Sequence, residues 1–133
     1  MKKGLLYYLK AFLLIVGLFG SCAVVSTLAM DTICYNTLSQ RLPVYPGATI
    51  TVERYSFMRR YGMGETILVL NSDDATDTVR EWYGHERGRL AQQIRRDRTM
   101  NLFYGFTTAV SSVTTAEDGT GSQIVLSGAC AAG

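Results

Sequence analysis

The sequence holds little of what catalytic sites are usually built from. It has one histidine and three cysteines in 133 residues, and it contains neither a Cys-x-x-Cys pair nor a Gly-x-Ser-x-Gly motif. A zinc or haem site would therefore have few ligands. A serine nucleophile would have no obvious base. We expect no catalytic residue, no cofactor and no metal, and so a protein that is not an enzyme.

The few groups that could carry chemistry have simpler explanations. His85 has no second ligand or nucleophile near it in the sequence. Glu53 and Glu65 could form a carboxylate pair of the kind that glycosidases use, but exposed strand positions explain both. Gly62-Met63-Gly64 precedes an expected strand, whereas a nucleotide-binding glycine loop precedes a helix. None of these residues identifies a reaction.

Lysine is absent after Lys10, and this makes the net charge of +2 misleading. The three lysines lie in the first ten residues, so the rest of the chain sets ten arginines against eleven acidic residues. A nearly neutral domain lacks the basic surface of a nucleic-acid-binding protein. The domain has two arginine clusters, Arg59-Arg60 and Arg95-Arg96 with Arg98. They are either solvated surface residues or contacts for an acidic partner or anionic lipid headgroups.

Charge is also absent from Ala11–Met30, a run of twenty residues. As a helix it would cover about 30 Å, which is the thickness of the hydrocarbon core of a bilayer. Positive flanks stay in the cytoplasm, and the lysines lie on the N-terminal side. We expect residues 1–10 in the cytoplasm, a single plasma-membrane span over 11–30, a stem and turn over 31–47, and a domain over 48–133 on the outer (periplasmic or extracellular) face.

Two alternatives to this span remain open. A signal peptide could be cleaved after Thr27-Leu28-Ala29. A lipoprotein could be cleaved before Cys22 and lipidated there, although Ala23-Val24-Val25 continues the apolar run where a polar tether is usual. An uncleaved span is favoured. Within the span, Gly17, Gly20 and Ser21 share one helix face. Small residues on one face let membrane helices pack closely, so this face is a candidate for contact with partner helices. The alternative is that Gly and Ser are simply frequent in spans.

Cys34 and Cys130 lie near the two ends of the expected outer domain. Disulfides persist outside the reducing interior of the cell, so these two residues are a natural pair. The alternative is two unpaired thiols or metal ligands.

The pattern of the outer domain predicts an α+β fold with the order β-β-α-β-β, an antiparallel sheet with one packed helix. We expect a Pro46-Gly47 turn and strands over 48–55 and 65–71, the second buried on both faces. A helix over about 75–95 has Ser72-Asp73-Asp74 as caps, with Asp73, Asp74 and Asp77 near its first turn, where negative charge matches the helix dipole. Gly84 and Gly88 mark a kink or a close approach. A strand, or two with a bend near Gly105, follows over 101–115, and one more over 122–127. Apart from the proposed disulfide at Cys130, the tail after Ser127 is expected to lack structure.

The connection from Ser56 to Gly64 is unusually apolar for a loop. Aromatic residues and Met in such a segment either fold back over the core or are offered to a partner, because both are enriched in interface cores. The candidate partner-contact residues are Phe57, Met58, Arg59, Arg60, Tyr61 and Met63.

Val44-Tyr45-Pro46-Gly47-Ala48, followed by paired strands and Thr78–Tyr83, resembles a loose group of uncharacterised small bacterial exported domains. These have a YPGA-type opening and a Val-x-x-Trp/Phe-Tyr helix. The resemblance covers about Leu42 to Tyr83, and the Gly-Trp sequence often found after such a helix is missing. By architecture alone, a single span with a small outer domain is similar to accessory subunits of bacterial electron-transfer complexes such as alternative complex III or photosynthetic reaction-centre assemblies.

Two functions follow from these expectations. The first is a non-catalytic, single-span accessory subunit of a larger membrane complex, with other membrane subunits and the lipid bilayer as its partners and no nucleic acid. The resemblance by architecture implies a respiratory or photosynthetic electron-transfer complex. The second is a free-standing anchored or lipidated binding module, in which the Ser56–Gly64 loop with Tyr83 and Tyr104 forms a small-ligand platform.

Overall fold

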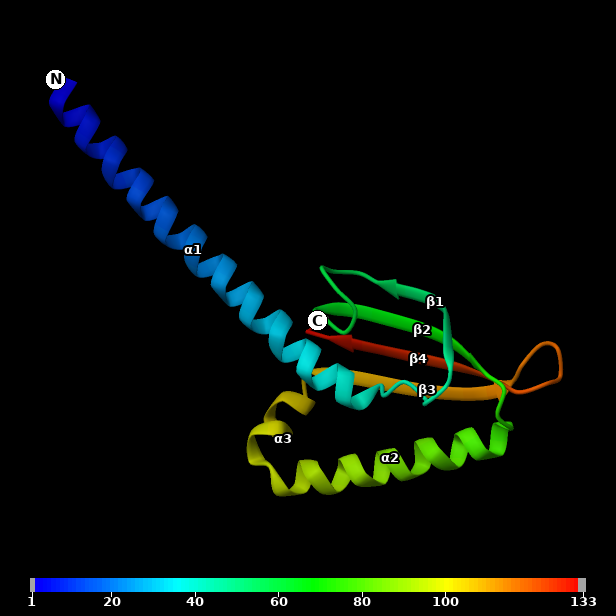
Figure 1. The fold of residues 1–133 in the computed structure, drawn as a ribbon. Coiled ribbons are helices and arrows are strands. Elements are labelled where there is room, and N and C mark those ends of the chain that lie inside the picture. Colours follow the sequence, from blue (N-terminus) through cyan, green and yellow to red (C-terminus); the bar gives the residue numbers. More distant parts are fainter. Residues whose placement is uncertain (1, 132–133) are drawn as a thin grey trace. The chain divides into compact units, whose positions relative to one another are not determined.

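The computed structural model of the chain describes residues 2–131 (Figure 1). Its elements in order are α1 (Lys2–Arg41), β1 (Thr49–Tyr55), β2 (Gly64–Ser72), α2 (Thr76–Arg96), α3 (Arg98–Tyr104), β3 (Thr107–Thr115) and β4 (Ser122–Cys130). The chain divides into two compact units, residues 1–31 and 32–133. The second unit is an α+β domain, as the sequence predicts.

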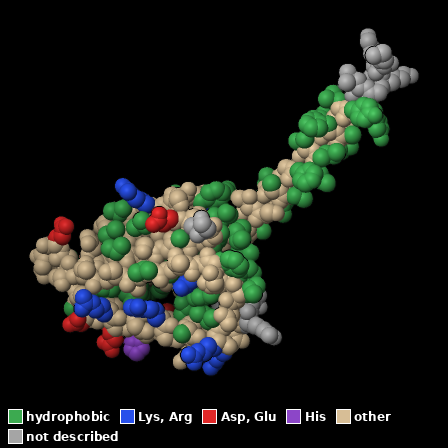
Figure 2. Space-filling view, turned by 180° about the vertical axis from the view of Figure 1, so that it is seen from behind, with side chains coloured by type: hydrophobic (Ala, Val, Ile, Leu, Met, Phe, Trp, Pro, Cys, Tyr) green, Lys and Arg blue, Asp and Glu red, His purple; other side chains and the backbone are tan. Residues whose placement is uncertain are grey.

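The first unit is helical, and its side chains are almost all exposed from Tyr7 to Val25. Figure 2 shows apolar side chains along this helix. None of its most apolar stretch is buried inside the structure, so it is not a core helix of the described chain. The helix is long and apolar enough to cross a membrane.

The sheet of the second unit has four antiparallel strands in the order β1-β2-β4-β3 (Figure 1). One face is buried along the two central strands, where Leu68 and Leu70 of β2 lie opposite Leu126 and Ile124 of β4. On the other face Ile67 and Val69 are only half-buried. The expectation that this strand is buried on both faces is therefore wrong, because one layer alone covers the sheet.

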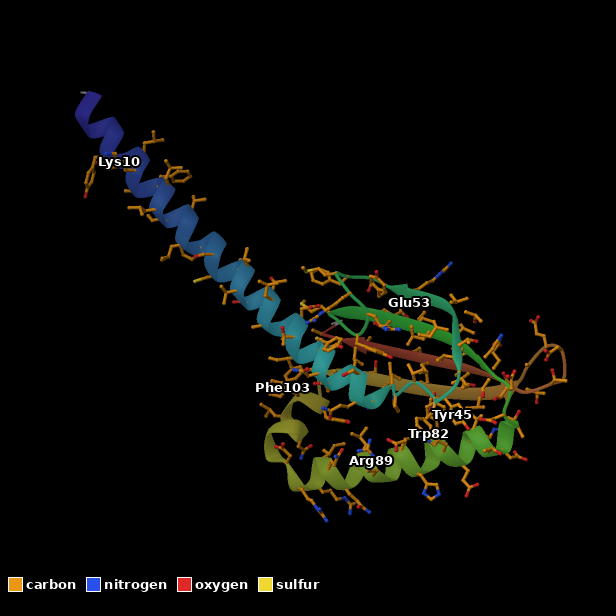
Figure 3. The ribbon with its side chains drawn as sticks, viewed as in Figure 1. Lys10, Tyr45, Glu53, Trp82, Arg89 and Phe103 are labelled. Atoms are coloured by element: carbon orange, nitrogen blue, oxygen red, sulfur yellow. A yellow bond between two sulfur atoms is a disulfide. The ribbon has the colours of Figure 1, made fainter. Side chains whose placement is uncertain are left out.

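That layer comes from α2 and from the end of α1. Val79 and Tyr83 are the buried residues of α2, and α2 contacts β3, β4 and α3. Figure 3 shows Tyr45 beside Trp82 of α2, and their ring centroids are 5.2 Å apart. The packed helix that the sequence predicts is thus present.

The end of α1 is the main departure from the sequence prediction. A polar stem was expected from Asp31, but the helix continues to Arg41. Cys34, Leu38 and Leu42 recur at helical spacing and are almost completely buried. Burying each leucine stabilises the fold by about 1.5–3 kcal/mol, and this outweighs the polar character of the residues between them.

Gly128 of β4 makes room for this helix end. A β-carbon at Gly128 would lie 2.8 Å from Cδ1 of Leu42, 2.9 Å from the carbonyl oxygen of Thr108 and 3.0 Å from Cδ2 of Leu38. Cys130 follows two residues later and forms a disulfide with Cys34, with 5.6 Å between their α-carbons. The predicted disulfide is confirmed, and it joins the end of α1 to the end of β4.

Two further segments, residues 101–104 and the C-terminal tail, differ from the prediction. Residues 101–104 belong to α3 rather than to a strand, and the strand begins only at Thr107, beyond the expected break near Gly105. The tail expected to lack structure extends β4 to Cys130, because Gly128–Cys130 pairs with Gly64–Thr66 on one side and Thr107–Ala109 on the other.

The start of α2 also differs. Ala75 is the N-cap and has no side-chain capping bond, so the aspartate caps are wrong, and only Asp77 lies in the first turn. The carboxylate of Asp74 instead accepts a 2.8 Å hydrogen bond from the hydroxyl of Tyr45. Gly84 and Gly88 lie within one continuous helix, and a β-carbon added at either would meet nothing within 4 Å, so no close approach among the described residues requires them.

Gly128 and Gly88 give a matched pair of predictions. Gly128→Ala should lower the free energy of unfolding by about 1–3 kcal/mol, because the new methyl group overfills the contact between α1 and β4. Gly88→Ala should raise it by up to about 1 kcal/mol, because the site is an open helix position. Urea unfolding followed by circular dichroism measures both. Equal effects of the two changes would contradict this description of the core.

Candidate binding surfaces

The Ser56–Gly64 loop is divided between core and surface. Tyr61 is buried, its hydroxyl donates a 3.2 Å hydrogen bond to the carbonyl of Leu42, and its N–H donates to the hydroxyl of Thr66 at 3.0 Å. Burial raises the pKa of Tyr61, so its hydroxyl stays protonated and can donate. Tyr61 is therefore part of the core, and Met63 is half-buried.

The two loop arginines are positioned by aromatic rings. The guanidinium carbon of Arg59 lies 4.5 Å from the ring centroid of Tyr35, and that of Arg60 lies 5.5 Å from the ring of Tyr61. Arg60 also forms a 3.6 Å ion pair with Glu53. These contacts hold the loop against the end of α1 and against β1 while leaving it basic.

The remaining apolar residues of the loop continue an exposed strand. All seven residues of β1 are exposed, and the strand is at the edge of the sheet. Met58 is 62% exposed, the most of any large apolar residue in this region. We call the following set the β1 surface: Ile50, Val52, Tyr55, Phe57 and Met58.

The predicted residues of the membrane helix are all exposed. A β-carbon at Gly17 or Gly20 would have no neighbour within 4 Å, and the hydroxyl of Ser21 donates to the carbonyl of Leu18 at 2.8 Å. Cys22 is a free, exposed cysteine. The structure leaves both expectations for this helix, packing and lipidation, as predictions.

Tyr83 and Tyr104 come together without the loop. Both line a cavity beside α2 whose lining includes no residue of the Ser56–Gly64 loop, so the loop is not part of this cavity and the three-part ligand platform stays a prediction. The hydroxyl of Tyr83 donates a 3.0 Å hydrogen bond to the carbonyl of Pro43, and burial raises the pKa of Tyr83. Arg41, which lines the same cavity, had no role in the sequence analysis, because a single arginine after an apolar run carries no distinguishing pattern.

The acidic, histidine and cysteine side chains of the described residues are the candidates for a metal site. Among these described residues, no three His, Cys, Asp or Glu side chains are close enough to hold a metal ion. His85 lies on the exposed side of α2 with Glu81 at 3.8 Å, a spacing of one helical turn. Glu53 pairs with Arg60, as a surface residue of a strand can.

Comparison with protein-family models, with curated proteins and with solved structures finds no match to this chain. The resemblance to small exported domains and to accessory subunits therefore stays a prediction.

Tyr61 and Tyr83 donate to successive carbonyls, those of Leu42 and Pro43, where the chain leaves α1. Tyr61→Phe and Tyr83→Phe should each lower the free energy of unfolding by about 0.5–1.5 kcal/mol, the usual net value of such a bond. Tyr35→Phe is the control, since the Tyr35 ring is partly exposed and its described contacts are made by the ring. Chemical unfolding curves measure all three, and an equal loss in the control would remove the proposed role of the two hydroxyls.

Proposed function

We propose that the protein is a non-catalytic, single-span subunit of a larger bacterial membrane complex. Its N-terminus lies in the cytoplasm, and its α+β domain docks on the outer part of a partner through the β1 surface. The observation that carries the proposal is that all seven residues of β1, a sheet-edge strand with apolar side chains, are exposed. Natural proteins usually cover or charge such an edge, because its unpaired backbone groups can pair with another chain.

The chemistry of this edge indicates the partner. An extended segment can add to the open side of β1 through backbone hydrogen bonds, while apolar side chains fill contacts along it. Residues 49–64 contain one acidic residue and three arginines, so an acidic segment is electrostatically matched. The partner is therefore an outer-face protein segment that is extended and acidic and offers apolar side chains. The electron-transfer complexes suggested by architecture are candidates for it.

The compartment supports this proposal independently of the surface. The Cys34–Cys130 disulfide fits an oxidising compartment, and α1 is long and apolar enough to span the bilayer. The lysines before the span favour a cytoplasmic N-terminus. Gly17, Gly20 and Ser21 would then be the face on which α1 meets partner helices.

Purification from native membranes in mild detergent tests the proposal. The parent chain should be recovered with partner subunits in fixed ratio. Met58→Asp should reduce that recovery at least tenfold, because a buried, unpaired carboxylate at the interface costs more than about 1.4 kcal/mol. Leu102→Asp is the matched control, since Leu102 is 68% exposed but lies on α3, away from the β1 surface.

A double variant in which Leu replaces both Gly17 and Gly20 tests, by the same purification, whether α1 packs on partner helices through these small residues. Val16→Leu is the control. Recovery of the parent chain as a monomer would contradict the accessory-subunit proposal. Equal loss with Met58→Asp and Leu102→Asp would contradict the assignment of the β1 surface.

A further inference from the structure

A cavity of about 330 Å³ lies between the end of α1, α2, α3 and β3. Figure 2 shows a hollow between the sheet and α2 with a basic side chain at its edge. Toward its C-terminal end, α2 contributes three apolar lining residues, Leu90, Ala91 and Ile94. Val79, Tyr83, Leu90 and Ile94 recur at helical spacing and form one apolar stripe of α2. Leu90 and Ile94 are only half-buried, whereas Val79 and Tyr83 are buried. The second half of the stripe thus borders a cavity instead of packing on the sheet.

The opposite side of the cavity carries a half-buried cation. Arg41 donates from Nη1 to the hydroxyl and carbonyl of Thr107 and, at 3.4 Å, to the carbonyl of Tyr104. Its guanidinium carbon lies 4.6 Å from the ring centroid of Tyr104. No carboxylate of the described residues forms an ion pair with it. Because all these bonds use Nη1, the Nη2 and Nε donors of Arg41 remain for an anion.

A second arginine, Arg87, and the residue Tyr104 line the same space. Arg87 donates from Nε to the carbonyl of Tyr83 at 3.3 Å. The Tyr104 hydroxyl is the one buried side-chain polar atom among the described residues that has no hydrogen-bond partner. A buried donor without a partner costs about 1–3 kcal/mol, so such groups call for an explanation.

The one acidic residue of the lining does not neutralise this site. Glu86 accepts three hydrogen bonds from Arg89 on α2, the shortest of 2.7 Å, and both of its carboxylate oxygens are engaged by that arginine. The cavity therefore combines two arginines and a hydroxyl donor with an apolar wall. Pockets that hold small molecules have this composition, mostly apolar with a few placed polar groups, and their volumes begin at about 300 Å³.

We propose that this cavity binds an amphipathic carboxylate, a single carboxylate group on an unbranched apolar chain. The carboxylate accepts from the planar guanidinium of Arg41 and from Arg87, with the Tyr104 hydroxyl as a further donor. The apolar chain lies along Leu90, Ala91 and Ile94. The proposal is independent of docking through β1, because none of the β1 surface lines the cavity.

The test uses the full chain in lipid nanodiscs, with octanoate as the probe and 1-octanol as its neutral counterpart. Isothermal titration, corrected with empty nanodiscs, should show one saturable octanoate site per chain and at least tenfold weaker binding of octanol. Arg87→Gln should weaken octanoate binding about tenfold or more and leave octanol unchanged, as expected for the loss of a hydrogen bond to a charged group.

Two tryptophan variants locate the site. Ala91→Trp fills the cavity from an exposed helix position and should abolish saturable binding, whereas Gln92→Trp, at the next exposed position outside the lining, should preserve it. Circular dichroism confirms that both variants fold. Equal binding of octanoate and octanol would overturn the proposal, as would unchanged binding in Ala91→Trp or a preference for octyl phosphate over octanoate.

Discussion

The contact between the last turns of α1 and strand β4 is the constraint on which the outer domain depends. Leu38 and Leu42 reach the sheet because Gly128 has no side chain, and the Cys34–Cys130 disulfide closes the same contact covalently across 96 residues of sequence. A cross-link that closes so long a loop can stabilise the fold by about 2–5 kcal/mol in the chain-entropy account. The domain is therefore built on the helix that also carries the apolar segment.

This arrangement explains why the remaining surfaces are available for binding. The end of α1 packs on β4, and α2 contacts β3 and β4, whereas β1 contacts β2 and all of its residues stay exposed. The end of α1, the second half of α2 and β3 together line the cavity beside Arg41. The same fold thus contains both the exposed edge strand and the candidate ligand site.

Much of the fold could be predicted because its signals are local. Alternation in the strands, the apolar stripe of α2 and the Pro46-Gly47 turn, where Gly47 has a φ of 81°, all depend on neighbouring residues. The disulfide could be predicted because the expected outer domain lies outside the reducing interior of the cell and contains two cysteines, Cys34 and Cys130. The errors lie where tertiary contacts overrule local character: a polar stem becomes helix because Leu38 is buried, and a small-residue tail becomes strand because it has a partner on each side. The cavity could not be predicted, since Arg41, Arg87 and Tyr104 are far apart in sequence and meet only in the fold.

The central claim is that the chain keeps its apolar segment in a membrane while its domain folds, with Cys34 bonded to Cys130, on the oxidising side. Intact mass spectrometry of the protein from carbonate-washed membranes, with and without reductant, tests it most directly. The account predicts a chain that retains residues 11–30, carries no lipid on Cys22 and gains the mass of two hydrogens on reduction. A soluble chain beginning after Ala29, or free thiols at Cys34 and Cys130, would contradict it.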